Sequence, residues 1–247
     1  QRVFPSVVES PAKPNPCAIR LRSRECSGLA SWDSTCTLTH VRGLYAIIDP
    51  DLSGEHEPVA LAEAILRGGC AALQLRSKTL PDDAYLALAR PLLTACDRVG
   101  VPFFVNDRVD VAEVLQGEGR DVGLHLGQDD MPVLQARKRF RGPVGLSTHN
   151  LDQVRQAHRL QVDLIGFGPV FPTRSKARPD PLVGPEGLRQ ACAASGVPVV
   201  AIGGVQRDNL SEVLAAGASL FAMIGALSSA ADPEGLARCL HGRVGVP

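Results

Sequence analysis

The chain of 247 residues has little of several features that mark specialised classes of protein. Aromatic residues make up only 4% of it, and no apolar run approaches the ~20 residues that a membrane-spanning helix requires. Its 26 basic and 26 acidic residues balance, so no strong field over the whole surface attracts nucleic acid or an anionic membrane. We therefore expect a soluble protein with no nucleic-acid partner, no membrane and only local anion sites.

Cysteine is present, but not in the spacing of a metal site. None of the seven cysteines forms a Cys-x-x-Cys pair, and their number is odd. In a chain of this length that pattern is typical of reduced thiols rather than of a disulfide framework. The sequence thus predicts a cytoplasmic protein whose main-body cysteines are core residues.

The first 42 residues differ in kind from the rest. They are rich in proline and arginine and show no lasting apolar periodicity, which predicts a poorly ordered extension. Glu9, Glu25 and Asp33, together with the lack of an apolar core, argue against a targeting peptide. We expect one domain over residues 43–240 and a C-terminal tail over 241–247.

From Gly43 onward, short apolar runs alternate with longer segments of helical periodicity, as in βαβ units. Asp82 and Asp208 stand where a helix N-cap would be expected. Eight such pairs in about two hundred residues predict an α/β protein, a single-domain (β/α)8 TIM barrel, and a doubly wound open sheet is the alternative. The predicted strands are 44–48, 71–75, 102–105, 122–125, 144–146, 164–168, 199–202 and 220–224, and the predicted helices include 58–67, 82–98, 132–140, 151–160, 187–194, 209–215 and 233–240.

Polar clusters follow six of these predicted strands. Because the carboxyl ends of the strands of such a barrel meet at one face, the clusters are expected to form a single mouth. Their cations, carboxylates, hydroxyls and glycines are what a site needs to hold a metal and several phosphates. The clusters are 74–78, 106–108, 127–130, 147–149, 171–176 and 203–204.

The cluster after the second strand predicts an anion site. The two-residue period of a strand sends Gln74, Arg76 and Lys78 to one side, and Leu75 and Ser77 to the other. An arginine and a lysine whose side chains converge need an anion between them. If this pair stood alone, Arg76 and Lys78 could equally be solvated charges of a loop.

Asp107 and Asp130 follow neighbouring strands, the third and the fourth, and could share a cation. Magnesium suits them, since it is commonly held by one or two carboxylates together with phosphate oxygens. Asp129 is a rival ligand that the spacing does not separate from Asp130. The alternative for both Asp107 and Asp130 is a purely structural role, as the cap of the following helix.

A second, metal-free phosphate site is expected after the last three strands. Hydroxyls and cations follow the sixth strand, and glycines that admit backbone amides follow the seventh and the eighth, where Gly225 precedes a short helix candidate. The residues are Thr173, Arg174, Ser175, Lys176, Gly203, Gly204, Ile224 and Gly225.

The clusters, in order, resemble the motifs of the thiamine-phosphate synthase family. Gln-Leu-Arg-Ser-Lys, Asn-Asp-Arg-Val-Asp, His-Leu-Gly-Gln-Asp-Asp, Gly-Leu-Ser-Thr-His, Gly-Pro-Val-Phe-Pro-Thr-Arg-Ser-Lys and Ala-Ile-Gly-Gly-Val cover residues 43 to about 240. The resemblance implies a magnesium-dependent transferase that joins 4-amino-2-methyl-5-hydroxymethylpyrimidine diphosphate to a (carboxy)thiazole phosphate. The products would be thiamine phosphate and pyrophosphate.

The same resemblance implies residue roles. Asp107 and Asp130 would bind Mg²⁺, and Arg76, Lys78, Ser147 and Lys176 would stabilise the leaving group. Substrate would be bound by Gln74, Leu75, Arg76, Ser77, Lys78, Asn106, Ser147, Thr173, Arg174, Ser175, Lys176, Gly204, Ile224 and Gly225. The chain departs from the family pattern at Ser77, where Glu is usual, at Ser175, where Thr is usual, and at Gly225, where Ser is common.

Two other functions stay open at this point. A thiazole tautomerase of the same superfamily uses a histidine at the position of His149, but generally lacks the carboxylate pair. A non-catalytic ligand-binding barrel would keep the fold and the pocket but would not convert the substrates to product. His125 lies within a predicted strand and is expected to be a packed residue rather than a base. The expected partners are small-molecule substrates, and a homo-oligomer is left open.

Overall fold

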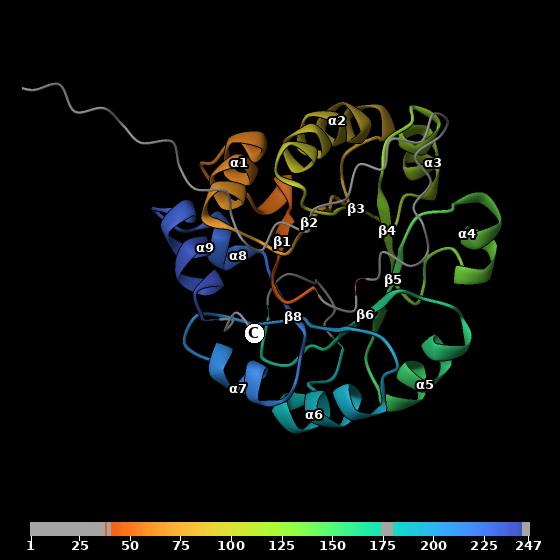
Figure 1. Cartoon of the computed structure of the whole chain (residues 1–247), viewed down its shortest axis with the longest axis vertical. Helices are drawn as coiled ribbons and strands as arrows, with labels where there is room; N and C mark the ends of the chain where they lie inside the picture. Colours follow the sequence, from red (N-terminus) through yellow and green to blue (C-terminus); the bar gives the residue numbers. More distant parts are fainter. Residues whose placement is uncertain (1–37, 39–40, 174–179, 244–247) are drawn as a thin grey trace, which may run out of the picture.

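The computed structural model describes residues 38, 41–173 and 180–243. It confirms the predicted (β/α)8 barrel, because eight parallel strands close in sequence order and β8 pairs with β1 (Figure 1). Each strand lies within two residues of its prediction. The strands are β1 (Gly43–Ile48), β2 (Ala72–Leu75), β3 (Phe103–Asn106), β4 (Gly123–Leu126), β5 (Val144–Thr148), β6 (Leu164–Phe167), β7 (Val199–Ala201) and β8 (Leu220–Met223).

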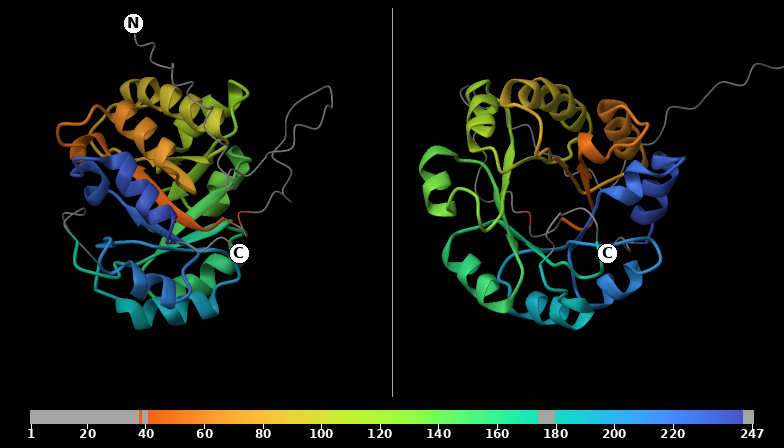
Figure 2. Two further views of the ribbon diagram at one scale, coloured as in Figure 1. Left: turned by 60° about the vertical axis from the view of Figure 1, so that its left-hand side comes forward. Right: turned by 180° about the vertical axis from the view of Figure 1, so that it is seen from behind.

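Helices follow the strands and surround the barrel in both views of Figure 2. They are the 3-10 turn η2 (Pro50–Leu52), α1 (Pro58–Gly68), α2 (Asp82–Val99), α3 (Val109–Gly117), α4 (Val133–Arg139), α5 (Leu151–Arg159), α6 (Gly184–Ala194), α7 (Leu210–Ala215), α8 (Gly225–Ser228) and α9 (Pro233–His241). No helix in the described part of the chain has the length and apolarity to cross a membrane.

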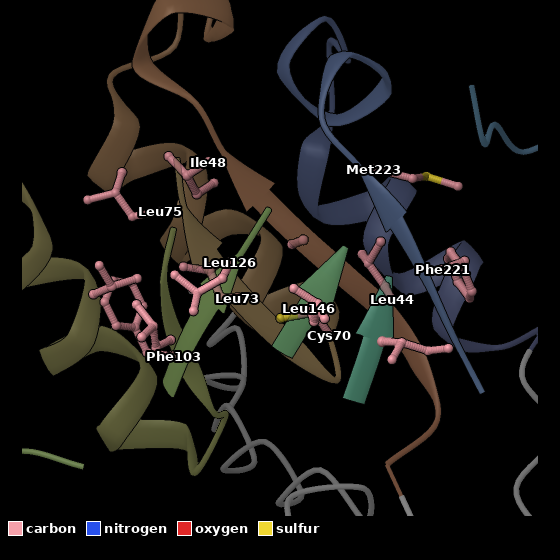
Figure 3. Close-up of a cluster of buried hydrophobic side chains, with 14 of the residues drawn as sticks. Leu44, Ile48, Cys70, Leu73, Leu75, Phe103, Leu126, Leu146, Phe221 and Met223 are labelled. Atoms are coloured by element: carbon pink, nitrogen blue, oxygen red, sulfur yellow. The ribbon is translucent and has the colours of Figure 1, made fainter. Parts of the chain in front are cut away.

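The strands alternate their side chains between two separate cores. Odd-even alternation places Tyr45 and Phe104 inside the barrel, where their ring centroids lie 5.6 Å apart. The neighbouring Leu44, Leu73 and Phe103 belong instead to the larger cluster between barrel and helices, part of which Figure 3 shows. The mouth therefore rests on strands that are packed on both faces.

Glycines on the inner face make room for large side chains. A Cβ at Gly123 would lie 2.4 Å from the Phe104 ring, and one at Gly145 would lie 2.5 Å from His125 Nδ1. Gly123 pairs with Phe104, and Gly145 pairs with His125, in the strand register. These glycines let an aromatic ring and an imidazole occupy the interior.

Several boundaries differ from the sequence expectations. Helix α2 begins at Asp82 itself, with Pro81 as its N-cap residue, and α7 has Asn209 as its N-cap residue, so neither Asp82 nor Asp208 is a cap. Leu38 and Val41, inside the expected extension, are buried against the interior cluster. Helix α9 includes His241, which was expected in the tail.

Candidate active site

Those polar residues expected at the mouth that the structure describes lie at or just beyond the carboxyl ends of the strands. Gln74, Asn106 and Ser147 belong to β2, β3 and β5, and the register places them on the inner face. Arg76 and Asp107 follow directly after β2 and β3. The fold therefore gathers residues from different loops at one end of the barrel.

A buried polar chain forms the floor of the mouth. Gln74 Nε2 donates to the Tyr45 hydroxyl at 3.0 Å, and the Tyr45 ring lies edge-on to His125. His125 Nε2 lies 3.1 Å from Ser147 Oγ. Burial lowers the pKa of His125 to about 4, so the imidazole is neutral at physiological pH. This agrees with the expected packed role of His125.

Arg76 is held by an acidic residue that the sequence reasoning did not single out. Asp49 Oδ2 accepts a hydrogen bond from Arg76 Nη1, and the Asp49 side chain is 0% exposed. Its Oδ1 also accepts from the backbone of Asp51 at 3.1 Å. Asp49 directly follows the apolar run of β1, which is the same signal that marked the other clusters.

Lys78 and Asp107 form an ion pair across the loops after β2 and β3. The backbone of Asp107 is left-handed, with φ of 63°, which is uncommon for a residue with a side chain. Its N–H donates to His125 O at 2.8 Å and fixes this turn against β4. The strained turn directs the carboxylate of Asp107 toward Lys78 and Asp130.

Asp107 and Asp130 lie side by side, as expected. Burial, followed by the hydrogen bond with Asp130, raises the pKa of Asp107 to about 6. Asp130 Oδ2 accepts from Gly127 N at 2.7 Å, and a Cβ at Gly127 would crowd that oxygen. Neither aspartate caps a helix, since α3 and α4 have no side-chain cap. Asp129 is exposed, so the carboxylate beside Asp107 is that of Asp130.

This donor set fits a hard divalent cation. Burial of the Asp107 carboxylate, and then the neighbouring Asp130, raise the pKa of Asp107 and so disfavour its charged form. Within the described ranges no group of three or more His, Cys, Asp or Glu is placed to hold a metal ion, and Asp107 and Asp130 present two carboxylates. Mg²⁺ commonly takes one or two carboxylates and completes its shell with water and phosphate oxygens.

The opposite side of the mouth is built from backbone. Gly203 and Gly204 have φ of 83° and 66°, and a Cβ at Gly204 would lie 2.5 Å from Pro172 O. Gly225 opens helix α8 directly after Ile224, and a Cβ there would meet nothing within 4 Å. A serine side chain at this position would therefore fit.

Several expected site residues lie elsewhere or cannot be placed. The Leu75 side chain is fully buried in the outer cluster (Figure 3), and Ser77 Oγ accepts from the backbone of Thr79 and Leu80 within its own loop. These two side chains are thus not directed at the mouth. Thr173 is half-buried. Arg174, Ser175 and Lys176 lie outside the described residues.

His149 is held in place by the loop after β6. Its Nδ1 lies 2.6 Å from Gly168 O, and its Nε2 lies 3.5 Å from Asp180 Oδ2. Both ring nitrogens therefore have partners within the protein. His149 therefore links the loop after β5 to the loop after β6.

Comparison with known proteins gives a consistent family. A family model described as "Thiamine monophosphate synthase" matches residues 44–227. A thiamine-phosphate synthase of Chlorobium luteolum is 40% identical over 200 residues, covering 80% of this chain and 90% of that protein. One of Archaeoglobus fulgidus is 40% identical over 195 residues, with 79% and 90% covered.

Solved structures show the same relationship. Thiamine phosphate pyrophosphorylase from Pyrococcus furiosus superposes with a TM-score of 0.75 at 33% identity, covering 84% of this chain and 98% of that chain. A 3-hexulose-6-phosphate synthase, at 17% identity and a TM-score of 0.59, shares the fold alone.

Proposed function

The chain belongs to the thiamine monophosphate synthase family, and from this premise we propose how the residues at its mouth carry out the reaction. The protein is a transferase of small-molecule substrates, which couples a pyrimidine and a thiazole moiety into thiamine phosphate. The observation that carries the residue assignment is the pairing of Asp107 with Asp130 beside Lys78. This arrangement suits a substrate that carries a diphosphate.

Hydroxymethylpyrimidine diphosphate binds on the β2 to β5 side. Arg76 and Lys78 approach the diphosphate as cations, and Ser147 donates a hydrogen bond to it. Gln74 and Asn106 lie on the inner face below these groups and orient the pyrimidine ring. Leu75 and Ser77 contribute only backbone, because their side chains point elsewhere.

Thiazole phosphate binds on the β6 to β8 side. Its phosphate is lined by Thr173, Gly204, Ile224 and Gly225. Gly204 and Gly225 have no side chain, so the phosphate can approach backbone N–H groups there. The sequence motif adds Arg174, Ser175 and Lys176 to this side, with Lys176 reaching the diphosphate. Separate sites for the two substrates agree with a reaction that joins two phosphorylated halves.

Bond cleavage precedes bond formation in the mechanism we favour. The carbon–oxygen bond of the pyrimidine diphosphate breaks, pyrophosphate leaves with the electron pair, and the electron-rich ring stabilises the methylene cation. The thiazole nitrogen then attacks that carbon and forms the carbon–nitrogen bond. No protein nucleophile takes part. The protein contributes preorganised positive charge and hydrogen bonds where the leaving group gains charge.

Asp107 and Asp130 would hold a Mg²⁺ ion in this scheme. When bound, the ion supplies charge stabilisation to the departing pyrophosphate. Lys78, paired with Asp107, stays beside the diphosphate in the same cluster.

We also propose that the enzyme works in the cytoplasm. The four cysteines in the described part of the chain, Cys70, Cys96, Cys192 and Cys239, are free thiols, as in a reducing compartment. A homo-oligomer stays a prediction, and light scattering of the purified chain would measure its mass.

The decisive experiment is a coupling assay with both phosphorylated substrates, with Mg²⁺ or with a chelator. The product is read after oxidation to its fluorescent form, and pyrophosphate release is measured in parallel.

Asp107→Asn should lower turnover by ~10²- to 10³-fold, since it removes stabilisation of the leaving group. The control variant Asp129→Asn, which changes the exposed neighbour of Asp130, should retain most of the wild-type turnover. Absence of product from the wild-type protein with Mg²⁺ would contradict the assignment and favour a tautomerase or a non-catalytic barrel.

A further inference from the structure

The Arg108 side chain lies against the loop that carries Lys78. Arg108 is the N-cap residue of α3, directly after Asp107. Its Nη2 donates to Leu80 O at 2.5 Å and to Ser77 O at 3.3 Å, and its Nη1 pairs with Asp82. One guanidinium thus holds the two backbone carbonyls that flank Lys78 in the loop and the first residue of α2.

The aromatic ring of Tyr85 supports the guanidinium from below. Arg108 Cζ lies 4.7 Å from the centroid of this ring, a cation–π arrangement. The hydroxyl of Tyr85 donates to Leu75 O at 2.5 Å and accepts from Asn106 N at 3.1 Å. Tyr85 therefore ties the end of β2 to the end of β3, and Arg108 ties the two loops beyond them.

The far side of the same loop is held by residues after β1. Arg76 pairs with the buried Asp49, and Thr79 Oγ1 donates to Asp51 Oδ1 at 2.6 Å. The loop from 76 to 80 is thus fastened to β1 on one side and, through Arg108, to β3 on the other. The ion pair of Lys78 with Asp107 thus joins two loops that are each held by further contacts.

We propose that Arg108 is a positioning residue that holds Lys78 in register with Asp107 for the diphosphate. This inference rests on the proposed function of the mouth. Arg108 acts through the loop carbonyls, since its donors are used on Ser77, Leu80 and Asp82 rather than on a ligand. The task needs a planar fork with several N–H groups, which lysine lacks.

The matched control is Arg120, which joins the same two helical units at the opposite end of the barrel. Arg120 Nη2 donates to Thr94 Oγ1 at 3.1 Å and to Asp97 Oδ2 at 2.7 Å. The two arginine side chains have similar exposure, 19% for Arg108 and 28% for Arg120. Only Arg108 lies near the mouth.

The test compares Arg108→Gln, Arg108→Lys and Arg120→Gln in steady-state kinetics with each substrate varied in turn. Binding of inorganic pyrophosphate with Mg²⁺ is measured by calorimetry on the same proteins, so that Arg108 is tested even if the wild-type chain fails to couple the substrates. Arg108→Gln should lower kcat/KM for the pyrimidine diphosphate and weaken pyrophosphate binding by about 10- to 100-fold, the usual cost of a misplaced group. The KM for thiazole phosphate should stay unchanged, because its site lies on the β6 to β8 side.

Arg108→Lys should recover only part of that loss, and it carries the test if Arg108→Gln fails to fold. Arg120→Gln should keep wild-type kinetics even if its melting temperature falls. Three results would overturn the proposal: full recovery by Arg108→Lys, which would show that charge alone matters; equal effects on both substrates; and kinetics of Arg108→Gln that match those of Arg120→Gln.

Discussion

At the scale of single residues, His125 shows how the interior of the barrel sets chemistry. Its imidazole is buried, its Nε2 faces Ser147, and its Nδ1 makes no hydrogen bond within the described part of the protein. Gly145 leaves space beside Nδ1 without supplying a polar partner. The ring can therefore support Ser147 in its neutral form, while its protonated form would be a poorly compensated buried charge.

Protonation of His125 should make stability fall with acid. Its folded pKa of about 4 lies below the ordinary value of 6.5, so the unfolded chain binds more protons between these values. The free energy of unfolding then decreases as pH falls through this window, by about 2 kcal/mol at pH 5 from this residue alone. Urea denaturation of wild-type protein and His125→Gln at pH 7.5 and pH 5 would measure it. An equal loss in both proteins would contradict this origin, since other groups titrate alike in the two.

At the scale of elements, close packing of helices explains why some glycines stand at helix ends. Gly68 ends α1, where a Cβ would lie 2.3 Å from Glu234 O and 2.7 Å from Ala237 Cβ of α9. Gly117 ends α3, where a Cβ would meet nothing within 4 Å. The same residue type at the same helical position thus has a steric role in one helix and none in the other.

This contrast predicts opposite effects of alanine. Gly68→Ala should lower the free energy of unfolding by roughly 1–3 kcal/mol, because the added methyl group forces α1 away from α9. Gly117→Ala should be neutral or raise it by up to about 1 kcal/mol, because it reduces the entropy of the unfolded chain without a clash. Chemical denaturation of both variants measures the pair. A Gly68→Ala protein as stable as Gly117→Ala would show that α9 shifts freely to accept the methyl group.

At the scale of the whole molecule, stability and chemistry are carried by different layers. The larger apolar cluster, part of which is drawn in Figure 3, fills the space between barrel and helices. The polar residues Gln74, Asn106 and Ser147 lie instead at the carboxyl ends of β2, β3 and β5. Ion pairs outside this layer join neighbouring helices: Arg67 of α1 pairs with Glu234 of α9, and Arg90 of α2 pairs with Glu118 at the end of α3. These pairs are exposed and add little stability, so the buried layer is what holds the barrel.

A truncation in that layer should therefore change stability and leave substrate binding alone. Leu124 of β4 is 0% exposed in the outer cluster, and Leu124→Ala should cost about 2–5 kcal/mol through lost contacts and a cavity. Leu134 of α4 is 56% exposed, and Leu134→Ala should change stability by no more than about 0.5 kcal/mol. Denaturation and KM at low temperature would be measured on both. A large rise in KM for Leu124→Ala would show that the layer and the mouth are not separate.

The sequence by itself determined the architecture and the end of the barrel at which the polar clusters meet. Alternating apolar and helical periods place the strands to within two residues, and a parallel barrel brings every strand end to one face. The two-residue period also separated Gln74 and Arg76 from Leu75 and Ser77, because side-chain direction in a strand is a local property.

Only the tertiary structure decided which side chains meet. Three contacts depend on how separate loops approach one another. Asp130 rather than Asp129 lies beside Asp107, and Asp49 pairs with Arg76. Asp82, which is not a helix cap, pairs with Arg108. Such contacts arise from closure of the barrel, which brings together residues distant along the chain. Local periodicity carries no information about them, because it describes each strand and helix alone.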